Sequence, residues 1–376
     1  MQKNYTLGKL FGISVQIHYT WFLVFLLMVW SLSTEFFPIN YPGMKSSYYV
    51  VISIVSALML FISVLLHELS HSLTARRFKI KVGMITLFFF GGIAHISDDK
   101  LTAKSEFWMA IAGPAFSILF ALLSWILFKL VMVFDFVFLE GGSIVLFFLF
   151  RLNLMLGIFN MFPGFPLDGG RVFRSIIWWV SGDLERATKY ASKGGRIFAY
   201  ILIGLGILEI VLLGSFGGLW FIVLGLFLRS IANQSYQQVL VKKVLEKLKI
   251  KDIMKTKFDY LVPEMNLSDV ARKIARKSSI YYLVLEKKKL VGVLDINTFS
   301  NVKKKERKKT LVKDVMIRPE QTKGLHKDMN AFGSMTLLLK KNYLFIPVIN
   351  KKAELVGIIE KRYVLDLIQG QLDLKK

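Results

Sequence analysis

The chain has 376 residues, 54% of them hydrophobic, and a mean hydropathy of +0.50, which excludes an ordinary soluble globular protein. No nucleic-acid recognition motif accompanies the formal net charge of +24, so nucleic acid is not an expected partner. There is no cysteine, which excludes disulfides and thiolate ligands, so any metal must be held by histidine and carboxylate groups.

Long apolar segments fill the chain up to about residue 232, and a charged, mixed sequence begins near residue 240. About six segments are long enough to cross a hydrocarbon core of about 30 Å. They are expected near residues 19–32, 49–73, 107–134, 144–162, 197–213 and 219–231. The sequence therefore predicts a polytopic α-helical membrane domain over 1–235, a linker over 236–249 and a second domain over 250–376.

Lysine and arginine are concentrated on one side of these predicted spans. Arg76, Arg77, Lys79 and Lys81 follow the second span, whereas the connections on the opposite side near 135–142 and 214–218 contain neither residue. The positive-inside rule then places both termini and the C-terminal domain in the cytoplasm. We expect a multi-pass protein of the plasma membrane, with the lipid bilayer as its first partner.

The second predicted span contains His67-Glu68-Leu69-Ser70-His71, an H-E-x-x-H pentad. Histidines four residues apart share one face of a helix and can bind the same zinc ion. Glu68 is placed to take a proton from a metal-bound water. Ionisable groups inside a membrane helix are costly and are candidates for function. The alternative is a pair of buried polar residues near the headgroups, and it weakens once a third ligand is found.

A catalytic zinc usually takes three protein ligands, and the candidate for the third is Asp168. It lies in the segment Asn-Met-Phe-Pro-Gly-Phe-Pro-Leu-Asp-Gly-Gly-Arg at 160–171. Two prolines break the helix there, and Gly169 and Gly170 allow the chain to bring the carboxylate back toward the metal. In the alternative interpretation Asp168 caps a helix over 171–180.

The apolar stretch 82–96 between the second and third spans contains His95, a rival metal ligand. It is too short to span twice and is interrupted by Gly91 and Gly92, so we expect a re-entrant β-hairpin or loop beside the pentad. An exposed edge strand can hold a substrate segment as an added strand. Gly91, Gly92 and His95 are therefore candidate substrate-binding residues, with His95 placed on the substrate side rather than on the metal.

Together these motifs resemble the site-2 protease family of intramembrane zinc metalloproteases, over roughly residues 5–232. The matching pieces, in the order of the family, are the pentad, Phe-Gly-Gly at 90–92, Ala-Gly-Pro at 112–114 and the 160–171 segment. The resemblance implies one zinc per chain, held by His67, His71 and Asp168, with Glu68 as the general base. This chain has Ser117 where the family often carries Asn.

The resemblance also implies that Asn160 helps to bind the substrate backbone near the metal. The expected activity is that of an intramembrane metalloendopeptidase, which hydrolyses peptide bonds of transmembrane substrates near the cytoplasmic leaflet. A regulatory membrane protein is a further partner that the sequence leaves open.

Residues 250–369 contain an internal repeat. Ile-Lys-Asp-Ile-Met at 250–254 recurs as Val-Lys-Asp-Val-Met at 312–316. Each copy precedes a helical stretch, an apolar strand and a Val-Gly step, at Gly292 and Gly357. This repeat resembles a tandem pair of CBS motifs, which predicts a cytoplasmic α/β domain and implies a site for adenine nucleotides. Assembly of homo-oligomers through this domain is an open possibility.

The nucleotide signal in the repeat departs from the usual pattern. Asp295 and Glu360 stand three residues after the two glycines, where nucleotide-binding motifs usually have Thr or Ser. A carboxylate there repels phosphate. Adenine nucleotide, adenosine, another ligand and a purely structural role therefore all remain open.

The main alternative function is a membrane ion or metal transporter gated by the CBS pair, in which the pentad and Asp168 would line an ion pathway. The third-ligand motif and the position of Glu68 between the two histidines count against it. An inactive homologue that acts as a scaffold is a third possibility, although every expected catalytic residue is present.

Overall fold

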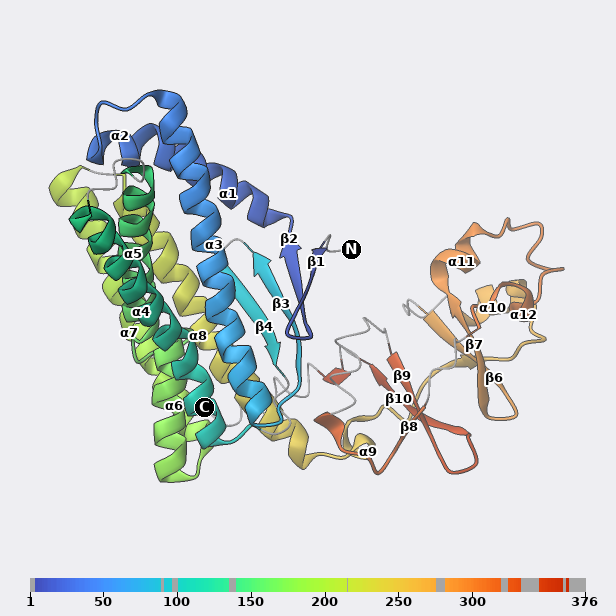
Figure 1. Ribbon diagram of the computed structural model, residues 1–376. Coiled ribbons are helices and arrows are strands. Elements are labelled where there is room, and N and C mark those ends of the chain that lie inside the picture. Colours follow the sequence, from blue (N-terminus) through green and yellow to red (C-terminus); the bar gives the residue numbers. More distant parts are fainter. Residues whose placement is uncertain are drawn as a thin grey trace. The chain divides into compact units, whose positions relative to one another are not determined.

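The computed structural model describes residues 4–88, 91–96, 101–134, 140–214, 216–274, 281–318, 324–332, 345–360 and 363–364. The chain divides into two compact units, residues 1–237 and 238–376 (Figure 1). Each unit has its own secondary structure and core, and each is considered by itself below.

The first unit is organised around α3 (Ser46–Arg77), the helix that carries the pentad. This helix packs against α1 (Thr20–Ser31), α4 (Ala103–Val133) and α5 (Glu140–Asn160), and also against the strands β3 and β4 (Figure 1). The remaining helical segments are η1 (Leu32–Phe36), α2 (Phe37–Asn40), α6 (Asp168–Ser181), α7 (Leu184–Leu213) and α8 (Gly218–Lys247). α6 packs on α4 and on α7.

Five helical segments in the described part of the chain are long and apolar enough to cross a membrane. They are 20–40, 46–77, 103–133, 141–160 and 184–213. An α-helical membrane protein is thereby confirmed, whereas the predicted number of six spans is not. The sixth predicted segment forms the N-terminal part of α8, where Arg229 ends the apolar run and polar residues follow. The predicted linker over 236–249 lies largely within the same helix, and the predicted domain boundaries stay predictions.

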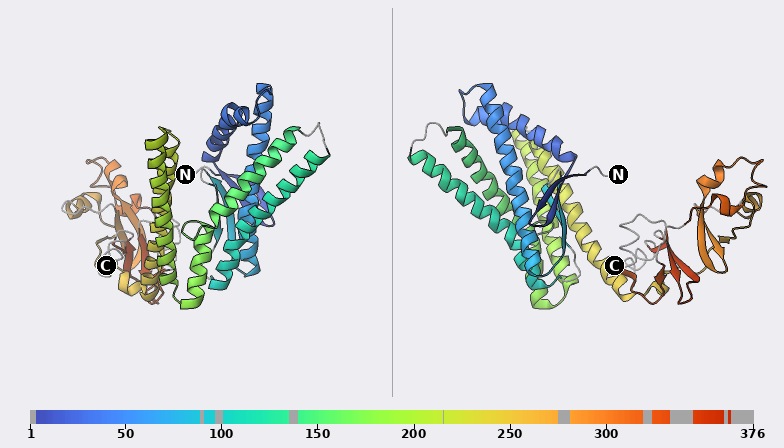
Figure 2. Two further views of the ribbon diagram at one scale, coloured as in Figure 1. Left: turned by 90° about the vertical axis from the view of Figure 1, so that its left-hand side faces the viewer. Right: turned by 45° about the vertical axis from the view of Figure 1, so that its right-hand side comes forward.

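A four-stranded sheet of order β1-β2-β3-β4 accompanies these helices (Figure 2). β1 (Asn4–Leu10) and β2 (Ile13–His18) form a hairpin, β2 and β3 (Val82–Phe88) are parallel, and β3 and β4 (Gly91–Ile96) are antiparallel. The hairpin expected over 82–96 is thus present, while its re-entrant position stays a prediction. The first hairpin was not anticipated, although alternating burial of Ile13, Val15 and Ile17 follows the period of a strand.

A buried ion pair joins α4 to α6. Glu106 is fully buried, and the Arg174 side chain donates to Glu106 Oε1 from Nε at 2.8 Å and also from Nη2. The Arg174 guanidinium lies 4.8 Å from the centre of the Phe165 ring. Because both charges are removed from water, loss of either one leaves the other uncompensated. The pair therefore fixes the position of α6, whose first residue is Asp168.

The second unit consists of two similar halves. One half contains the three-stranded sheet β5-β6-β7 and the other contains β10-β9-β8, and in each a short strand pairs parallel to the first strand of an antiparallel hairpin. The strands are β5 (Tyr260–Leu261), β6 (Tyr281–Glu286), β7 (Lys289–Asp295), β8 (Leu325–His326), β9 (Phe345–Ile349) and β10 (Leu355–Glu360). The helices are α9 (Ile250–Ile253), α10 (Leu267–Ile274), α11 (Ile296–Asn301) and α12 (Val312–Val315).

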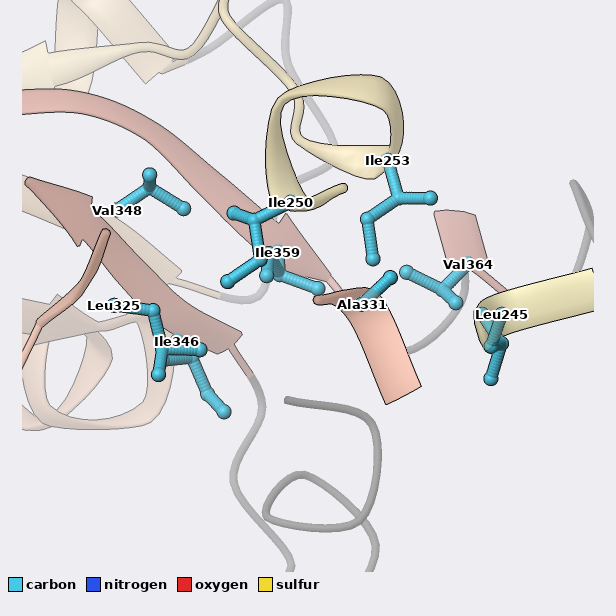
Figure 3. Packing of buried hydrophobic residues seen from close by; sticks show 9 residues of the cluster. All are labelled: Leu245, Ile250, Ile253, Leu325, Ala331, Ile346, Val348, Ile359 and Val364. Atoms are coloured by element: carbon cyan, nitrogen blue, oxygen red, sulfur yellow. The ribbon is translucent and has the colours of Figure 1, made fainter. Parts of the chain in front are cut away.

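The residue that follows each copy of the repeated motif pairs with a strand of the opposite half. Lys255 pairs with Ile358 of β10, and Ile317 pairs with Val293 of β7. A Cβ added at Gly357 would lie 2.9 Å from Met254 Sδ, and one added at Gly292 would lie 2.3 Å from Met316 Sδ. The methionine of each motif therefore occupies the space that the glycine of the opposite half leaves free. Figure 3 shows the core cluster of the second half, into which Ile250 and Ile253 of α9 point.

We expect Arg174→Met to lower the free energy of unfolding by about 3–5 kcal/mol, because it leaves the Glu106 carboxylate buried and unpaired. The double change Glu106→Leu with Arg174→Met should cost less than the single change. Thermal unfolding of the detergent-purified protein measures both, with Lys189→Met on exposed α7 surface as the control. Equal stabilities of the wild type and the single variant would contradict the assignment.

Candidate metal centre

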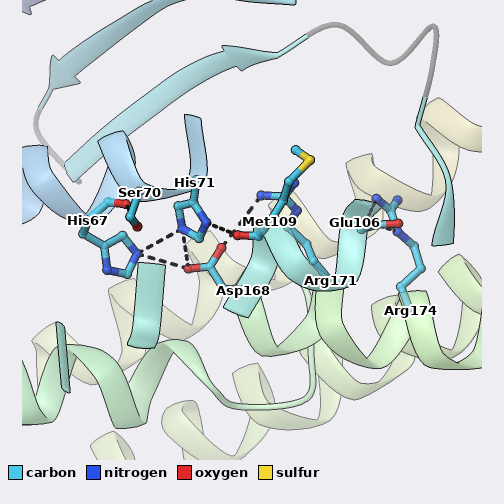
Figure 4. Close-up of polar contacts among 8 residues, drawn as sticks. All are labelled: His67, Ser70, His71, Glu106, Met109, Asp168, Arg171 and Arg174. Atoms are coloured by element: carbon cyan, nitrogen blue, oxygen red, sulfur yellow. Dashed lines mark hydrogen bonds and ion pairs between the residues drawn. The ribbon is translucent and has the colours of Figure 1, made fainter. Parts of the chain in front are cut away.

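Three side chains from two helices meet beside α4. His67 and His71 lie one turn apart on α3, and Asp168 is the first residue of α6. Asp168 Oδ2 is 3.2 Å from His67 Nε2 and 3.1 Å from His71 Nε2, and the two nitrogens are 3.2 Å apart (Figure 4). One donor atom from each residue lies within 4.8 Å of the others. Two imidazoles and one carboxylate form a donor set suited to a catalytic zinc.

Helix α4 holds both imidazole rings through their Nδ1 atoms. His71 Nδ1 is 2.5 Å from the carbonyl oxygen of Met109, which can only accept a hydrogen bond. This nitrogen is therefore the protonated one, and the lone pair of Nε2 is free for a metal. His67 Nδ1 lies 2.8 Å from the Ser117 hydroxyl, which is fully buried. Both rings are thus turned so that Nε2 faces Asp168.

Ser117 is the contact that sequence reasoning missed. The sequence showed a serine at a position where related proteins often carry Asn, and no role for it followed. The available signal was its spacing: Ser117 lies four residues after Gly113, on the same face of α4. The face of α4 that approaches the pentad therefore carries a polar partner as well as a glycine.

Gly113 is where α4 comes nearest to the two histidines. A Cβ added there would lie 2.2 Å from His71 Nε2 and 2.6 Å from His67 Nε2. These distances are close to the zinc–nitrogen distance of about 2.0–2.1 Å. The space that a side chain at this position would fill is therefore the space that a metal ion between the two rings needs. This observation shows that the residues present fit a zinc ion.

Asp168 is positioned by the loop 161–167. This loop connects α5 to α6 and packs against the backbones of α6 and α7. A Cβ at Gly169 would meet Met161 O at 2.2 Å, and a Cβ at Gly195 of α7 would meet Phe165 O at 1.8 Å. The Phe165 amide donates to Ala191 O at 3.1 Å. Only glycines permit so close a contact of backbones, so they hold the loop that presents Asp168.

The alternative of Asp168 as a helix cap does not describe the structure. α6 begins at Asp168 itself, and its N-cap, Leu167, makes no side-chain capping hydrogen bond. One carboxylate oxygen faces the histidines and the other lies 3.9 Å from Arg171 Nη1. The carboxylate is therefore directed toward the pentad.

Glu68 lies beneath the edge strand β4. A Cβ at Gly92 would come within 2.4 Å of Glu68 Cγ and 3.4 Å of its Oε1. Among the described strands β4 has a neighbour on one side only, since it ends the sheet. The candidate base therefore packs against the strand whose other edge is free among the described strands.

The other predicted substrate-binding residues lie around this strand and the end of α5. Gly91 begins β4 with a φ of +123°, which favours glycine. His95 belongs to β4, and its side chain lies outside the described residues. Asn160 is the last residue of α5 and begins the connection to Asp168. Their roles stay predictions.

Asp295 and Glu360, the acidic residues that follow the two Val-Gly steps, make contacts within the second unit. The Asp295 carboxylate accepts from the Asn297 amide at 2.6 Å and caps α11. The Tyr281 hydroxyl donates to Glu360 at 3.1 Å, and Lys255 Nζ lies 3.5 Å from the same carboxylate. Burial and the Glu360 charge raise the pKa of Tyr281 above its usual range. Both carboxylates thus have a structural role in this unit.

Comparisons with known proteins identify the families that the two parts of the chain match. Peptidase family M50 matches residues 55–141 and 135–202, and the CBS domain family matches residues 250–301. A protein of Synechocystis sp. named as a zinc metalloprotease is 30% identical over 98% of this chain and 96% of its own length. A zinc metalloprotease of Methanocaldococcus jannaschii is 32% identical over 85% of this chain and 84% of its own length.

Among solved structures, a site-2 protease from Methanocaldococcus jannaschii is similar, with 28% identity and a TM-score of 0.42. The match covers 62% of this chain and 95% of that chain.

We expect Gly113→Ala to abolish zinc binding, because the added methyl group occupies the metal position. Its melting temperature should equal that of wild-type protein treated with a chelator, which separates metal loss from misfolding. Elemental analysis of the purified protein measures the metal. Gly204→Ala is the control, since a Cβ at Gly204 has nothing within 4 Å. A Gly113→Ala protein that retains its zinc would refute this placement of the ion.

Ser117→Ala should weaken zinc binding by about 10–100-fold, because the His67 ring loses the partner that orients it. Titration against a competing chelator measures the affinity. Ser124→Ala on the same helix is the matched control, since the Ser124 hydroxyl donates only to its own helix, at Phe120 O (2.8 Å). Unchanged affinity in the Ser117 variant would show that the hydroxyl does not support the ring.

Proposed function

Because the chain belongs to peptidase family M50, the site-2 proteases, and is therefore a zinc metalloprotease of that type, we propose that His67, His71 and Asp168 bind one zinc per chain. The observation that carries this proposal is the meeting of the three donor atoms at the space left by Gly113. When bound, zinc supplies the Lewis acid that polarises the scissile carbonyl and activates water.

Glu68 is the proposed general base. Glu68 is the residue after His67 in α3, and its side chain lies against Gly92 of β4. There it takes a proton from the attacking water and later delivers this proton to the leaving amine. One carboxylate serves both transfers, because it holds the proton between the two steps.

The proposed substrates are transmembrane segments of other membrane proteins. Such a segment must unwind before hydrolysis, since helical hydrogen bonds shield its peptide groups. The free edge of β4 offers backbone groups for an added strand. Gly91, Gly92 and His95 would line this strand, and Asn160 would hold the substrate backbone from the end of α5.

The proposed setting is the plasma membrane, crossed several times, with both termini and the CBS domain in the cytoplasm. Cleavage would then occur near the cytoplasmic leaflet. The CBS domain is proposed to regulate the protease through a bound ligand, with an adenine nucleotide as one candidate. A regulatory membrane protein and self-association through the CBS domain are further proposed partners. Family membership favours this function over the CBS-gated transporter.

The test compares zinc content and cleavage in the wild type, Glu68→Gln and Asp168→Ala. Wild type and Glu68→Gln should each hold about one zinc per chain, and Asp168→Ala little. Cleavage of a model transmembrane substrate should fall by about 10²-fold or more in Glu68→Gln, because the proton acceptor is lost.

Glu209→Gln in α7 is the control, since it removes a carboxylate from another membrane helix. Full cleavage by Glu68→Gln would rule out Glu68 as the base. Full zinc content in Asp168→Ala would rule out Asp168 as a ligand.

A further inference from the structure

A groove of about 530 Å³ follows one face of α5 in the first unit. Its wall contains Phe36 of η1 and, from α5, Phe148, Arg151, Met155, Ile158 and Phe159. The α5 positions recur at intervals of three or four residues and so lie on one side of the helix. The groove extends over about 16 Å of α5 at 1.5 Å per residue, and it ends beside Asn160, where the connection to Asp168 begins.

Among the described residues that line the groove, Arg151 is the one with a charge, and the others are apolar. It is exposed, and its guanidinium carbon lies 5.9 Å from the centre of the Phe147 ring. Among the described residues no carboxylate forms an ion pair with it. The Tyr41 phenol interacts with it electrostatically, but a phenol is neutral near pH 7. The groove therefore carries an unneutralised positive charge.

The depth of Arg151 indicates which kind of anion can reach it. Arg151 is eleven residues from Glu140 and nine from Asn160, or about 16 and 14 Å from the two ends of α5. Phosphate headgroups of lipids lie at the ends of such a helix, not at its centre. A carboxylate carried by a transmembrane segment can lie at the centre. Charged groups within membrane helices usually pair with one another and mark the path of a substrate.

We propose that this groove docks the transmembrane segment of the substrate and that Arg151 selects segments carrying Asp or Glu. The inference rests on the proposed function and adds a substrate class to it. A substrate helix lying along α5 has the same rise per residue as α5. Its carboxylate would therefore stand about nine residues from the bond that is cleaved, on the side farther from the metal centre.

The experiment measures binding of a synthetic transmembrane peptide to the full-length protein in phosphatidylcholine vesicles by fluorescence energy transfer. The peptide is rich in Leu and Ala, with Gly-Gly at the intended cleavage point and Glu nine residues away. A second peptide has Gln in place of Glu. Wild-type protein should bind the Glu peptide roughly tenfold more tightly, a difference of about 1.4 kcal/mol.

Variants of Arg151 assign the preference to its charge. Arg151→Gln should bind both peptides equally, and Arg151→Glu should instead prefer a peptide with Lys at the same position. Lys129→Gln is the matched control, because Lys129 is an exposed cation on another membrane helix that also lies 5.9 Å from an aromatic ring, that of Trp125. This control should retain the preference for Glu.

Equal binding of the Glu and Gln peptides by wild-type protein would overturn the proposal. So would an Arg151→Gln variant that keeps the preference for Glu. If this variant instead loses affinity for phosphatidylglycerol, measured in vesicles that also contain this lipid, the groove holds lipid, and if it loses only self-association, the groove holds a second copy. Binding is read without hydrolysis. A charge preference without cleavage would count against the proposed protease alone, and cleavage without a charge preference would count against the Arg151 proposal alone.

Discussion

The close contact between α3 and α4 at Gly113 is the constraint on which the metal centre depends. It brings the backbone of α4 against the two imidazoles, leaves room for an ion between them, and places Met109 and Ser117 at their Nδ1 atoms. A side chain at position 113 would close this space and push the helices apart. The polar chemistry of the site thus rests on a steric condition met by one glycine.

The same principle positions the third donor. Gly169, Gly170 and Gly195 let the loop 161–167 pack backbone against backbone between α6 and α7. The buried pair of Glu106 and Arg174 joins α6 to α4, the helix that already orients the histidines. Helix α4 therefore contributes to the position of all three donor side chains. It orients the two imidazoles by hydrogen bonds and holds α6, which carries Asp168, by an ion pair.

The arrangement also relates the site to its surroundings within the first unit. Gly92 of the edge strand β4 lies against Glu68, and the groove along α5 ends beside Asn160. In the proposed mechanism an extended segment at β4 and a helical segment along α5 are parts of one substrate chain. The second unit has its own glycine contacts, in which Met254 and Met316 fit against glycines of opposite halves.

Local pattern was enough for the sequence alone to predict the membrane helices, the internal repeat and the grouping of His67 and His71, because helix period and apolar length are properties of neighbouring residues. Asp168 was predicted from a proline- and glycine-rich break, again a local signal. Tertiary structure alone decided the pairing of β2 with β3, the support of His67 by Ser117, and the position of Glu68 under Gly92. These contacts join segments far apart in the chain, and their geometry follows from helix packing, which no local spacing encodes.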